Sequence, residues 1–439
     1  MPFSLHGVHV PHRKNTADTK AQKIPAPFTI TLPMSMHIGK PANPVVKVGD
    51  NVCVGSLVAE QDGFVSSPIY SSISGKVTKF SDILLANGAT SKAVIIESDG
   101  EMTVDPSITP PEINSAEDLL EAIRKSGVVG LGGAGFPTYV KFNVDLSRIE
   151  ELIINGAECE PYITSDSYTM SERSEDMAIA ISAMEKYFGI KKIIIGIENN
   201  KKKAIDSMMK LAQNDPRITV KVLPSIYPQG GEKVLVYHTA GKTIAAGKLP
   251  IDVGCVVCNC TTMAAIGGYI RSGMPLVNKC VTVDGGAVAQ PKIVIAPIGT
   301  SISELIEFCG GFKEEPAKLL YGGPMMGISV PYPTLPILKN TNAIVALTSK
   351  ECGEPKTTAC IRCGTCTNHC PFGLNPAEIA RAYQKKDVDY LKKLRVDICM
   401  ECGCCSFICP AKRPLVQTNK LAKAYLKEEM MKEDKNNVK

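Results

Sequence analysis

Two cysteine runs near the C-terminal end constrain this chain more than any other feature of its sequence. Each run has the pattern C-x2-C-x2-C-x3-C-P; the first begins at Cys360 and the second at Cys399. Two-residue gaps let a tight loop place three thiolates on three corners of a [4Fe–4S] cubane, and the fourth cysteine, followed by proline, ligates the other cluster. Structural zinc sites instead favour paired two-cysteine knuckles. The spacing therefore predicts two [4Fe–4S] clusters.

Each predicted cluster takes three cysteines from one run and one from the other. The two predicted ligand sets are Cys360, Cys363, Cys366 and Cys409, and Cys399, Cys402, Cys405 and Cys370. Cys404 would break the spacing of the second run, so we interpret it as a spare thiol. Apolar positions at helical spacing between the runs predict a mostly helical module. Paired clusters pass single electrons, so an electron donor or acceptor must be bound elsewhere in the chain.

Composition favours a cytoplasmic protein. The chain holds 17 cysteines in 439 residues, and cysteines in reducing compartments are more often ligands than disulfides. No stretch approaches the roughly 18 apolar residues of a membrane helix, and the N-terminus lacks the apolar region of a secretory signal. A net charge of +5, spread along the chain, weakly supports an acidic protein partner and gives less support for nucleic acid. We expect membrane attachment only through a partner.

A glycine-rich loop occupies the middle of the chain and precedes Pro137 at a predicted helix start. Its glycines are Gly130, Gly132, Gly133 and Gly135. The spacing differs from G-x-G-x-x-G, and no convincing strand precedes the loop. Glycines in series before a helix nevertheless predict an amide-lined phosphate cradle. A flexible surface loop is the alternative.

Strand and helix patterns alternate after this loop. Strands are predicted at 152–155, 193–197 and 218–223, with helices at 175–188 and 200–211. Such alternation predicts a parallel sheet covered on both faces. Segments 155–161 and 227–233 leave strands at their carboxyl ends, where ligands bind in such folds.

These motifs carry a resemblance to a known family. The glycine loop, Phe136-Pro137-Thr138 with Lys141, segments 155–161 and 227–233, and Asn259-Cys-Thr-Thr262 follow the order of the FMN-binding, NADH-oxidising subunit of respiratory complex I. With the cysteine runs, the chain resembles the C subunit of the Rnf complexes over nearly its whole length. Those complexes are membrane-bound ferredoxin–NAD oxidoreductases that move cations.

The resemblance implies a flavin site built from ten residues. It places the FMN phosphate on the amides of Gly130, Gly132, Gly133 and Gly135, Lys141 near the flavin, Asn155 on its ring or ribityl chain, Glu158 and Tyr227 along the cleft, and Asn259 and Thr262 on the ribityl side. The sequence departs from complex I at Leu131, Ala157 and Gly231. Hydride transfer requires no general acid or base, so we assign no catalytic residue.

The resemblance also implies a multidomain α/β fold with four parts. These are residues 1–110 as an N-terminal arm and lipoyl-like barrel–sandwich hybrid, 111–275 as a Rossmann-like FMN- and NADH-binding domain, 276–345 as a β-grasp domain, and 346–439 as a helical dicluster ferredoxin-like domain with a C-terminal tail. Phe64 stands where a lipoyl domain carries its modified lysine, so we expect a packing or docking module. The histidine-bearing stretch 6–13 is interpreted as an irregular arm packed on a neighbour. Three cysteines are interpreted as buried structural thiols: Cys255, Cys258 and Cys260.

The function implied is an NADH/NAD+ oxidoreductase subunit of an ion-translocating electron-transport complex. It would use FMN and two [4Fe–4S] clusters, with NAD(H) as substrate, peripherally on the cytoplasmic side of the membrane. Its partners would be membrane and iron–sulfur subunits, with ferredoxin acting indirectly. A cobalamin reductase of bacterial microcompartments is similar over the same domains. A non-catalytic scaffold, as in the sodium-pumping quinone reductase, is disfavoured by the intact glycine loop and eight ligands.

Overall fold

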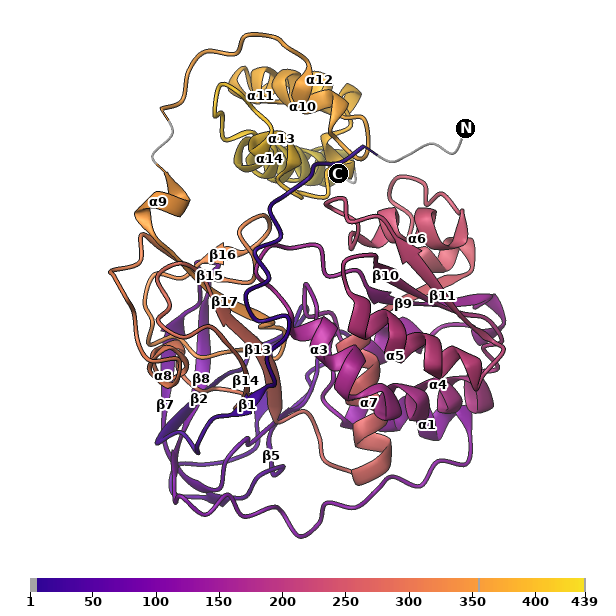
Figure 1. Ribbon diagram of the computed structural model, residues 1–439, viewed down its shortest axis with the longest axis vertical. Coiled ribbons are helices and arrows are strands. Elements are labelled where there is room, and N and C mark those ends of the chain that lie inside the picture. The colour runs from indigo at the N-terminus through magenta and orange to yellow at the C-terminus, as the bar shows by residue number, and fades with distance from the viewer. Residues whose placement is uncertain (1–5, 354–355, 438–439) are drawn as a thin grey trace.

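The computed structural model describes residues 6–353 and 356–437 (Figure 1). Four compact parts follow one another along the chain, and a helical module at the C-terminal end lies above the other three. Within the described residues, no helix is both long enough and apolar enough to cross a membrane.

The first part consists of two small antiparallel sheets that share a core. One sheet has the order β2-β8-β7-β4 and the other β3-β5-β6. Alternate residues of β2, such as Ile30 and Leu32, are fully buried against Val94 and Ile96 of β8. The strands are β2 (Thr29–Pro33), β3 (Asn43–Pro44), β4 (Asn51–Val52), β5 (Leu57–Glu60), β6 (Ile69–Tyr70), β7 (Gly75–Leu84) and β8 (Thr90–Ser98).

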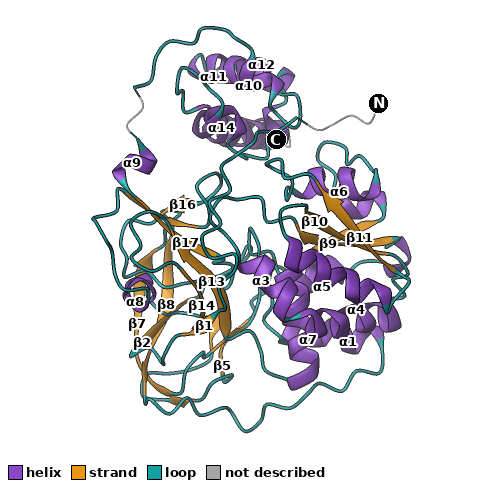
Figure 2. Cartoon of the chain, viewed as in Figure 1, coloured by secondary structure: helices purple, strands orange, loops and turns teal. Residues whose placement is uncertain are grey.

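The second part is a four-stranded parallel sheet with the order β11-β10-β9-β12 and helices on both faces (Figure 2). Neighbouring residues of β9 serve different cores, since Ile154 packs with α1, α4, α5 and α7 whereas Ile153 packs with α6. Burial on both faces is what a parallel sheet requires. Its elements are α1 (Ala116–Lys125), α2 (Thr138–Phe142), β9 (Glu151–Gly156), α3 (Ser165–Glu172), α4 (Ser174–Phe188), β10 (Ile193–Glu198), α5 (Lys202–Gln213), β11 (Ile218–Leu223), α6 (Glu232–Ala240), β12 (Cys255–Asn259) and α7 (Cys260–Ser272).

The third part is a mixed six-stranded sheet with the order β1-β14-β13-β17-β15-β16, covered by α8. The edge strand β1 comes from the N-terminal arm and pairs in parallel with β14. The arm therefore joins a sheet whose other strands lie more than 250 residues later in the chain. The elements are β1 (Gln22–Lys23), β13 (Asn278–Asp284), β14 (Lys292–Pro297), α8 (Ile302–Phe308), β15 (Lys318–Tyr321), β16 (Ile328–Ser329) and β17 (Ala343–Leu347).

The fourth part is the helical module that carries both cysteine runs. Its helices pack around Ile379, Leu391 and Ala422, which are almost fully buried. The chain reaches it after α9 (Ser349–Cys352) and arches over the outer end of the module in Figure 1. The module contains α10 (Thr365–Asn368), α11 (Pro376–Gln384), α12 (Val388–Lys393), α13 (Cys404–Phe407) and α14 (Leu415–Asn437).

The strong local signals of the sequence are confirmed. Ser115 and Asp118 form the capping box that opens α1, and Gly189 ends α4 in the left-handed conformation that favours glycine. The predicted strands and helices between 152 and 223 are present, with ends shifted by one or two residues. The sequence analysis missed strand β12, helices α3, α6 and α7, and the long helix α14 in place of a tail.

Candidate functional site

The glycine-rich loop lies between α1 and α2 and is closed at its base. The amide of Gly130 donates to the carbonyl of Phe136 at 2.8 Å. A Cβ on Gly132 would collide with the Asn259 side chain, and Gly135 has φ of +70°. Both positions therefore require glycine for steric reasons.

Three side chains from later parts of the chain hold this loop. Thr262 accepts from the amide of Leu131 at 3.0 Å, and Asn340 donates to the carbonyl of Gly133 at 2.9 Å. The buried ammonium of Lys279, on β13, donates to the carbonyl of Leu131 at 3.0 Å. The loop is a fixed structure, in contrast to the flexible-loop alternative.

Gly133 is the open position of the loop. A Cβ placed there would meet no protein atom within 4 Å. Its amide thus belongs to a part of the loop that the protein leaves uncovered, while Thr262 and Lys279 bond to Leu131 at the base and Asn259 packs against Gly132. Bare backbone on a braced loop fits the phosphate of a flavin nucleotide.

Asn155, at the carboxyl end of β9, connects two neighbouring segments. Its amide donates to the carbonyl of Gly230 at 2.9 Å, and its oxygen accepts from the amide of Ala157 at 3.1 Å. On the same side of the sheet, the Lys141 ammonium donates to the carbonyl of Val257 at 2.7 Å and lies 3.7 Å from Glu232. The structure thus gathers the motif residues of four separate segments at one edge of the sheet.

Asn259 caps helix α7 and braces the same edge. Its side-chain oxygen accepts from the amides of Thr261 and Thr262 at 2.9 and 3.3 Å. Its amide nitrogen donates to Asp166 at 2.8 Å, and the Thr261 hydroxyl donates to the other oxygen of Asp166 at 2.7 Å. Asp166 is therefore a structural centre of the site, and no motif pointed to it.

Glu158 is buried and turned toward the start of α3. Its carboxylate accepts from the amide of Asp166 at 2.7 Å and the hydroxyl of Ser167 at 2.8 Å. Burial raises the pKa of Glu158 to about 7 and lowers the pKa of the neighbouring Lys14 to about 8. The Lys14 ammonium donates to the carbonyls of Glu158, Glu160 and Ile163 at 2.5–2.9 Å. Both polar groups are thus satisfied within the protein.

Tyr227 joins the second part of the chain, the parallel sheet with its helices, to the helical module. We call this second part the flavin-type domain. The residue is 2% exposed, and its hydroxyl donates to the carbonyl of Cys402 at 2.6 Å. The Cys404 thiol in turn lies 3.8 Å from the carbonyl of Tyr227. Cys404, interpreted from the sequence as a spare thiol, is a buried part of this contact. The hydroxyl of Tyr227, expected along the cleft, lies against the second cysteine run.

A methionine and a glycine complete that contact. A Cβ on Gly231 would collide with the end of Met400, which lies inside the second cysteine run. Gly231 is one of the departures from complex I, where a glutamate is usual. The departure has a physical reason here, because the side chain of Met400 occupies the space that a larger residue would need.

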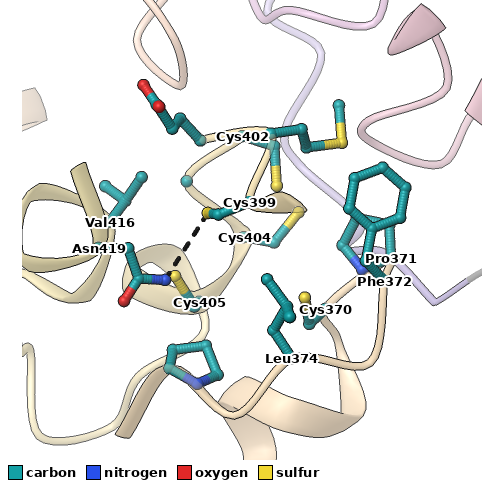
Figure 3. Close-up of a pocket in the computed structure, with 14 residues that line it drawn as sticks. Cys370, Pro371, Phe372, Leu374, Cys399, Cys402, Cys404, Cys405, Val416 and Asn419 are labelled. Atoms are coloured by element: carbon teal, nitrogen blue, oxygen red, sulfur yellow. Dashed lines mark hydrogen bonds between the residues drawn. The ribbon is translucent and has the colours of Figure 1, made fainter. Parts of the chain in front are cut away.

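Five cysteines line a hollow on the side of the helical module that faces Tyr227, which we call the inner site (Figure 3). They are Cys399, Cys402, Cys404 and Cys405, with Cys370 from the other run. Most of the remaining lining is apolar, including Phe372, Leu374 and Val416, and Glu401 is its one carboxylate. Asn419 donates to the Cys399 sulfur at 3.8 Å. The four cysteines that the spacing assigns to one cluster thus line one hollow, together with Cys404.

A second hollow, the outer site, is lined by the other four cysteines. They are Cys360, Cys363 and Cys366 with Cys409. Cys360 and Cys363 are exposed, unlike any cysteine of the inner site. Within the described residues, no three His, Cys, Asp or Glu groups are placed to hold a single metal ion. Ligands of a single metal ion converge on one point, whereas these four sulfurs are spaced around a hollow. That arrangement fits the corners of a cubane.

The other cysteine interpretations can be compared with the structure directly. Cys255, Cys258 and Cys260 are buried on β12 and at the start of α7, and burial raises the pKa of the first two thiols to about 11. The predicted burial of these thiols is confirmed. Phe64 is 57% exposed and packs edge-on against Tyr139 of α2, with ring centroids 6.1 Å apart. Phe64, which stands where a lipoyl domain carries its modified lysine, thus makes a packing contact beside the glycine loop.

Family models match four consecutive stretches of the chain. They describe an RnfC barrel sandwich hybrid domain at residues 3–101, a Nuo51 FMN-binding domain at 123–268, an SLBB domain at 280–329 and a 4Fe-4S dicluster domain at 355–410. The chain is also 40% identical to the C subunit of the Na(+)-translocating ferredoxin:NAD(+) oxidoreductase complex of Acetobacterium woodii, over 95% of each chain. The chain belongs to the RnfC family.

Two further RnfC relatives match most of this chain. The C subunit of the proton-translocating ferredoxin:NAD(+) oxidoreductase complex of Clostridium ljungdahlii is 40% identical, with 86% of this chain and 84% of the relative covered. The C subunit of the ion-translocating oxidoreductase complex of Rhodobacter capsulatus is 39% identical, with 97% and 84% covered. Among solved structures, the NAD+-reducing [NiFe]-hydrogenase in its H2-reduced state is 17% identical with a TM-score of 0.48, covering 71% of this chain and 63% of that one.

Several residues of the RnfC site were missed from the sequence. Lys14, Asp166 and Lys279 each hold a motif from a distance, and Glu160 accepts from the amides of Met325 and Met326 at 3.1 and 2.7 Å. Only Glu160 lies in a motif segment, 155–161, and nothing in that segment points to its methionine partners. Their partners are far away in the sequence, so a local pattern could not have found them.

Proposed function

We propose that this chain is the NAD-linked oxidoreductase subunit of an ion-translocating ferredoxin:NAD+ complex. The proposal is supported by its membership in the RnfC family, the FMN-binding and dicluster domain models, and relatives named as such subunits. FMN, when bound, supplies exchange between a hydride and two single electrons. The further task of the protein is to hold that flavin beside sites that pass electrons singly.

The ten sequence-predicted flavin residues divide into three groups in this proposal. The glycine loop, with Asn259 and Thr262 beneath it, forms the phosphate end of the site, and Lys141 and Asn155 lie at the ring or ribityl end. Glu158 and Tyr227 act through the backbone: Glu158 holds the start of α3, and Tyr227 holds the loop of Cys402.

One observation carries the proposal furthest, namely the docking of the inner site on the flavin-type domain. The Tyr227–Cys402 hydrogen bond and the Met400–Gly231 contact place the second cysteine run directly against segment 227–231, whose Gly230 is bonded to Asn155. We therefore propose that Cys370, Cys399, Cys402 and Cys405 hold the cluster next to the flavin. Cys360, Cys363, Cys366 and Cys409 hold the one farther away.

The finer architecture belongs to the same proposal. The parallel-sheet domain is Rossmann-like, the six-stranded sheet with α8 is the β-grasp domain, and the first part is lipoyl-like, with boundaries near residues 110, 275 and 345. The chain would attach to the cytoplasmic side of the membrane through other subunits of its complex.

The test compares two variants of one residue with a cluster-ligand variant. Gly133→Glu should abolish FMN binding, because its carboxylate would repel a phosphate at a position where the protein itself has room. Gly133→Gln has the same bulk without the charge and should weaken FMN binding less. Both variants should keep about eight irons per chain, as expected for two [4Fe–4S] clusters.

Cys399→Ser supplies the complementary result. It should leave FMN bound and NADH–ferricyanide activity nearly intact, remove about four irons, and stop electron delivery to partner proteins. Retention of stoichiometric FMN by Gly133→Glu would place the cradle elsewhere. Loss of ferricyanide activity by Cys399→Ser with FMN still bound would refute the flavin as an independent entry point.

A further inference from the structure

The outer site differs from the inner site in its exposure. Cys360 and Cys363 are exposed, and between them Ile361 is 67% exposed. The inner site lies against Tyr227 and Met400 and presents no exposed cysteine. Single electrons cross between proteins only when their centres come close, so of the two sites the outer one is accessible to a separate protein.

The two sites also differ in charge. Three arginines line the outer site, Arg362, Arg381 and Arg413, with Glu378 as the one carboxylate. Glu378 is already paired with Arg381 at 2.8 Å. The charged lining of the inner site consists of Glu401 alone. Cationic groups are thus concentrated where the thiols are exposed.

Part of this positive charge has a local explanation. A cluster bound by four thiolates is anionic, and the arginines that line the outer site would offset that charge. Lys356 and Lys412 lie outside the lining, on the exposed rim of the same face. The two rim segments are joined, because the Thr357 hydroxyl donates to the carbonyl of Lys412 at 3.1 Å. Within the described chain, neither lysine forms an ion pair, so their charge is directed to solvent.

We propose that this face, formed by Lys356, Ile361, Arg362, Lys412 and Arg413, is the docking surface for the acidic face of an iron–sulfur protein. One electron passes at this contact: the bound protein is oxidised by one electron and the chain is reduced by one, or the reverse, and no bond or proton is exchanged. Charge complementarity supplies the attraction and orientation, and Ile361 supplies apolar contact at the centre. The proposal rests on the proposed function and adds the place where an iron–sulfur partner binds and the charge that it presents.

An anionic membrane surface would also attract lysines beside an exposed isoleucine. The exposed cluster thiols favour a protein, since a lipid headgroup neither gives nor takes an electron. The two occupants can be separated experimentally, because they differ in what they bind and in what they do to the redox state of the chain.

The test uses a purified acidic two-[4Fe–4S] ferredoxin as a stand-in for the iron–sulfur partner and measures its binding to the holoprotein by calorimetry at low and high salt. Lys356→Glu/Lys412→Glu reverses charge on the rim without altering any residue that lines the outer site. The matched control is Lys191→Glu/Lys202→Glu, which makes the same charge change at exposed positions of the flavin-type domain. We expect the rim variant to weaken ferredoxin binding at least tenfold at low salt and to lose most of its salt dependence. The control should retain both.

Two further measurements make the outcome decisive. NADH–ferricyanide activity and iron content should be unchanged in the rim variant, and failure of ferricyanide activity in the wild type would count against the proposed function rather than against this surface. Equal ferredoxin binding by the rim variant and the control would overturn the docking surface. Binding to vesicles containing phosphatidylserine that is lost in the rim variant, without binding of ferredoxin, would also overturn it and assign the face to a membrane.

Discussion

At the scale of single residues, buried lysines join distant parts of the chain. Lys279 reaches from β13 to the glycine loop, and Lys339 donates to Ser67, Pro68 and Gly127 at 2.5–3.0 Å. Both ammonium groups are almost fully buried. Burial lowers the pKa of each, and that of Lys339 to about 7. Each lysine is justified by the backbone carbonyls it satisfies, since an unpaired buried carbonyl costs about 1–3 kcal/mol.

Lys279→Met should weaken FMN binding through the loop. The substitution leaves the carbonyl of Leu131 buried without its donor, and the loop shifts to regain one. We expect roughly a tenfold or larger rise in the FMN dissociation constant, measured by flavin fluorescence. Lys339→Met is the matched control, because it removes an equally buried ammonium from a different junction. It should lower thermal stability and leave FMN affinity within about twofold; equal FMN loss in both variants would contradict the positioning role.

His37 should make stability depend on pH. Its Nε2 accepts from the amide of Ser67 at 3.1 Å, and burial together with the Lys339 ammonium lowers its pKa to about 4. The unfolded chain, with an ordinary histidine pKa of about 6.5, binds the proton first as pH falls. Stability from this residue is therefore complete above pH 6.5 and is lost between 6.5 and 4. The loss stays below about 1.4 kcal/mol per pH unit because the ring is partly solvated.

The measurement is the difference in midpoint temperature between wild type and His37→Gln at pH 7 and pH 5. Glutamine can accept from the Ser67 amide but does not titrate, so the variant should gain on the wild type as pH falls. A difference that stays constant between the two pH values would show that His37 is not the titrating group.

At the scale of elements, the start of α7 is the part that unites the flavin site. Its cap residue, Asn259, must both accept and donate hydrogen bonds. Its side-chain oxygen accepts from the helix amides, and its side-chain nitrogen donates to Asp166. Helix α7 and strand β12 were not predicted, although both carry motif residues. Their pattern is apolar on nearly all sides because both are buried, and such runs show no clear period.

Asn259→Asp separates those two roles. Aspartate is as good an N-cap as asparagine, so capping alone predicts no loss of stability. In this site its carboxylate would face that of Asp166 in place of an amide donor, and we expect a loss of roughly 2 kcal/mol or more. Asn259→Ser, which keeps a cap oxygen without the added charge, should cost less. The variants are compared by thermal unfolding of the flavin-type domain, monitored by near-UV circular dichroism. Equal stability of the wild type and Asn259→Asp would contradict the contact between Asn259 and Asp166.

At the scale of the whole molecule, the functional contact is the one between the flavin-type domain and the helical module. Tyr227→Phe removes only the hydroxyl that donates to the carbonyl of Cys402. The carbonyl loses its partner at a cost of about 1–3 kcal/mol, so hydrogen exchange of residues 400–404 should accelerate roughly 5- to 100-fold. Tyr321→Phe is the control, because its hydroxyl donates to Pro336 within the third part of the chain. Unchanged exchange at 400–404 in Tyr227→Phe would show that this bond does not hold the module.

How far the sequence could predict this molecule depends on the distance between partners. The cysteine spacing predicts which sulfurs share a hollow, because the geometry of each run is local. The capping box of α1 is local for the same reason. The Lys279–Leu131 bond joins residues 148 positions apart, and the contact of Met400 with Gly231 spans two domains. Such contacts follow from how finished domains dock, which no periodicity records.

The N-terminal arm links the first residues of the chain to some of the last. Val8 pairs with Tyr227, Asn15 donates to Asp284 at 2.9 Å, and Arg13 lies 2.8 Å from Glu351, 338 positions later. At the usual rate of about 5–20 residues per second, a ribosome needs on the order of 20–70 s to reach that glutamate after making the arginine. The arm is thus made well before all of its partners exist. The arm closes the molecule only after the strands and loops it crosses have been made, so a chain that stops short of Glu351 leaves it unanchored at that end.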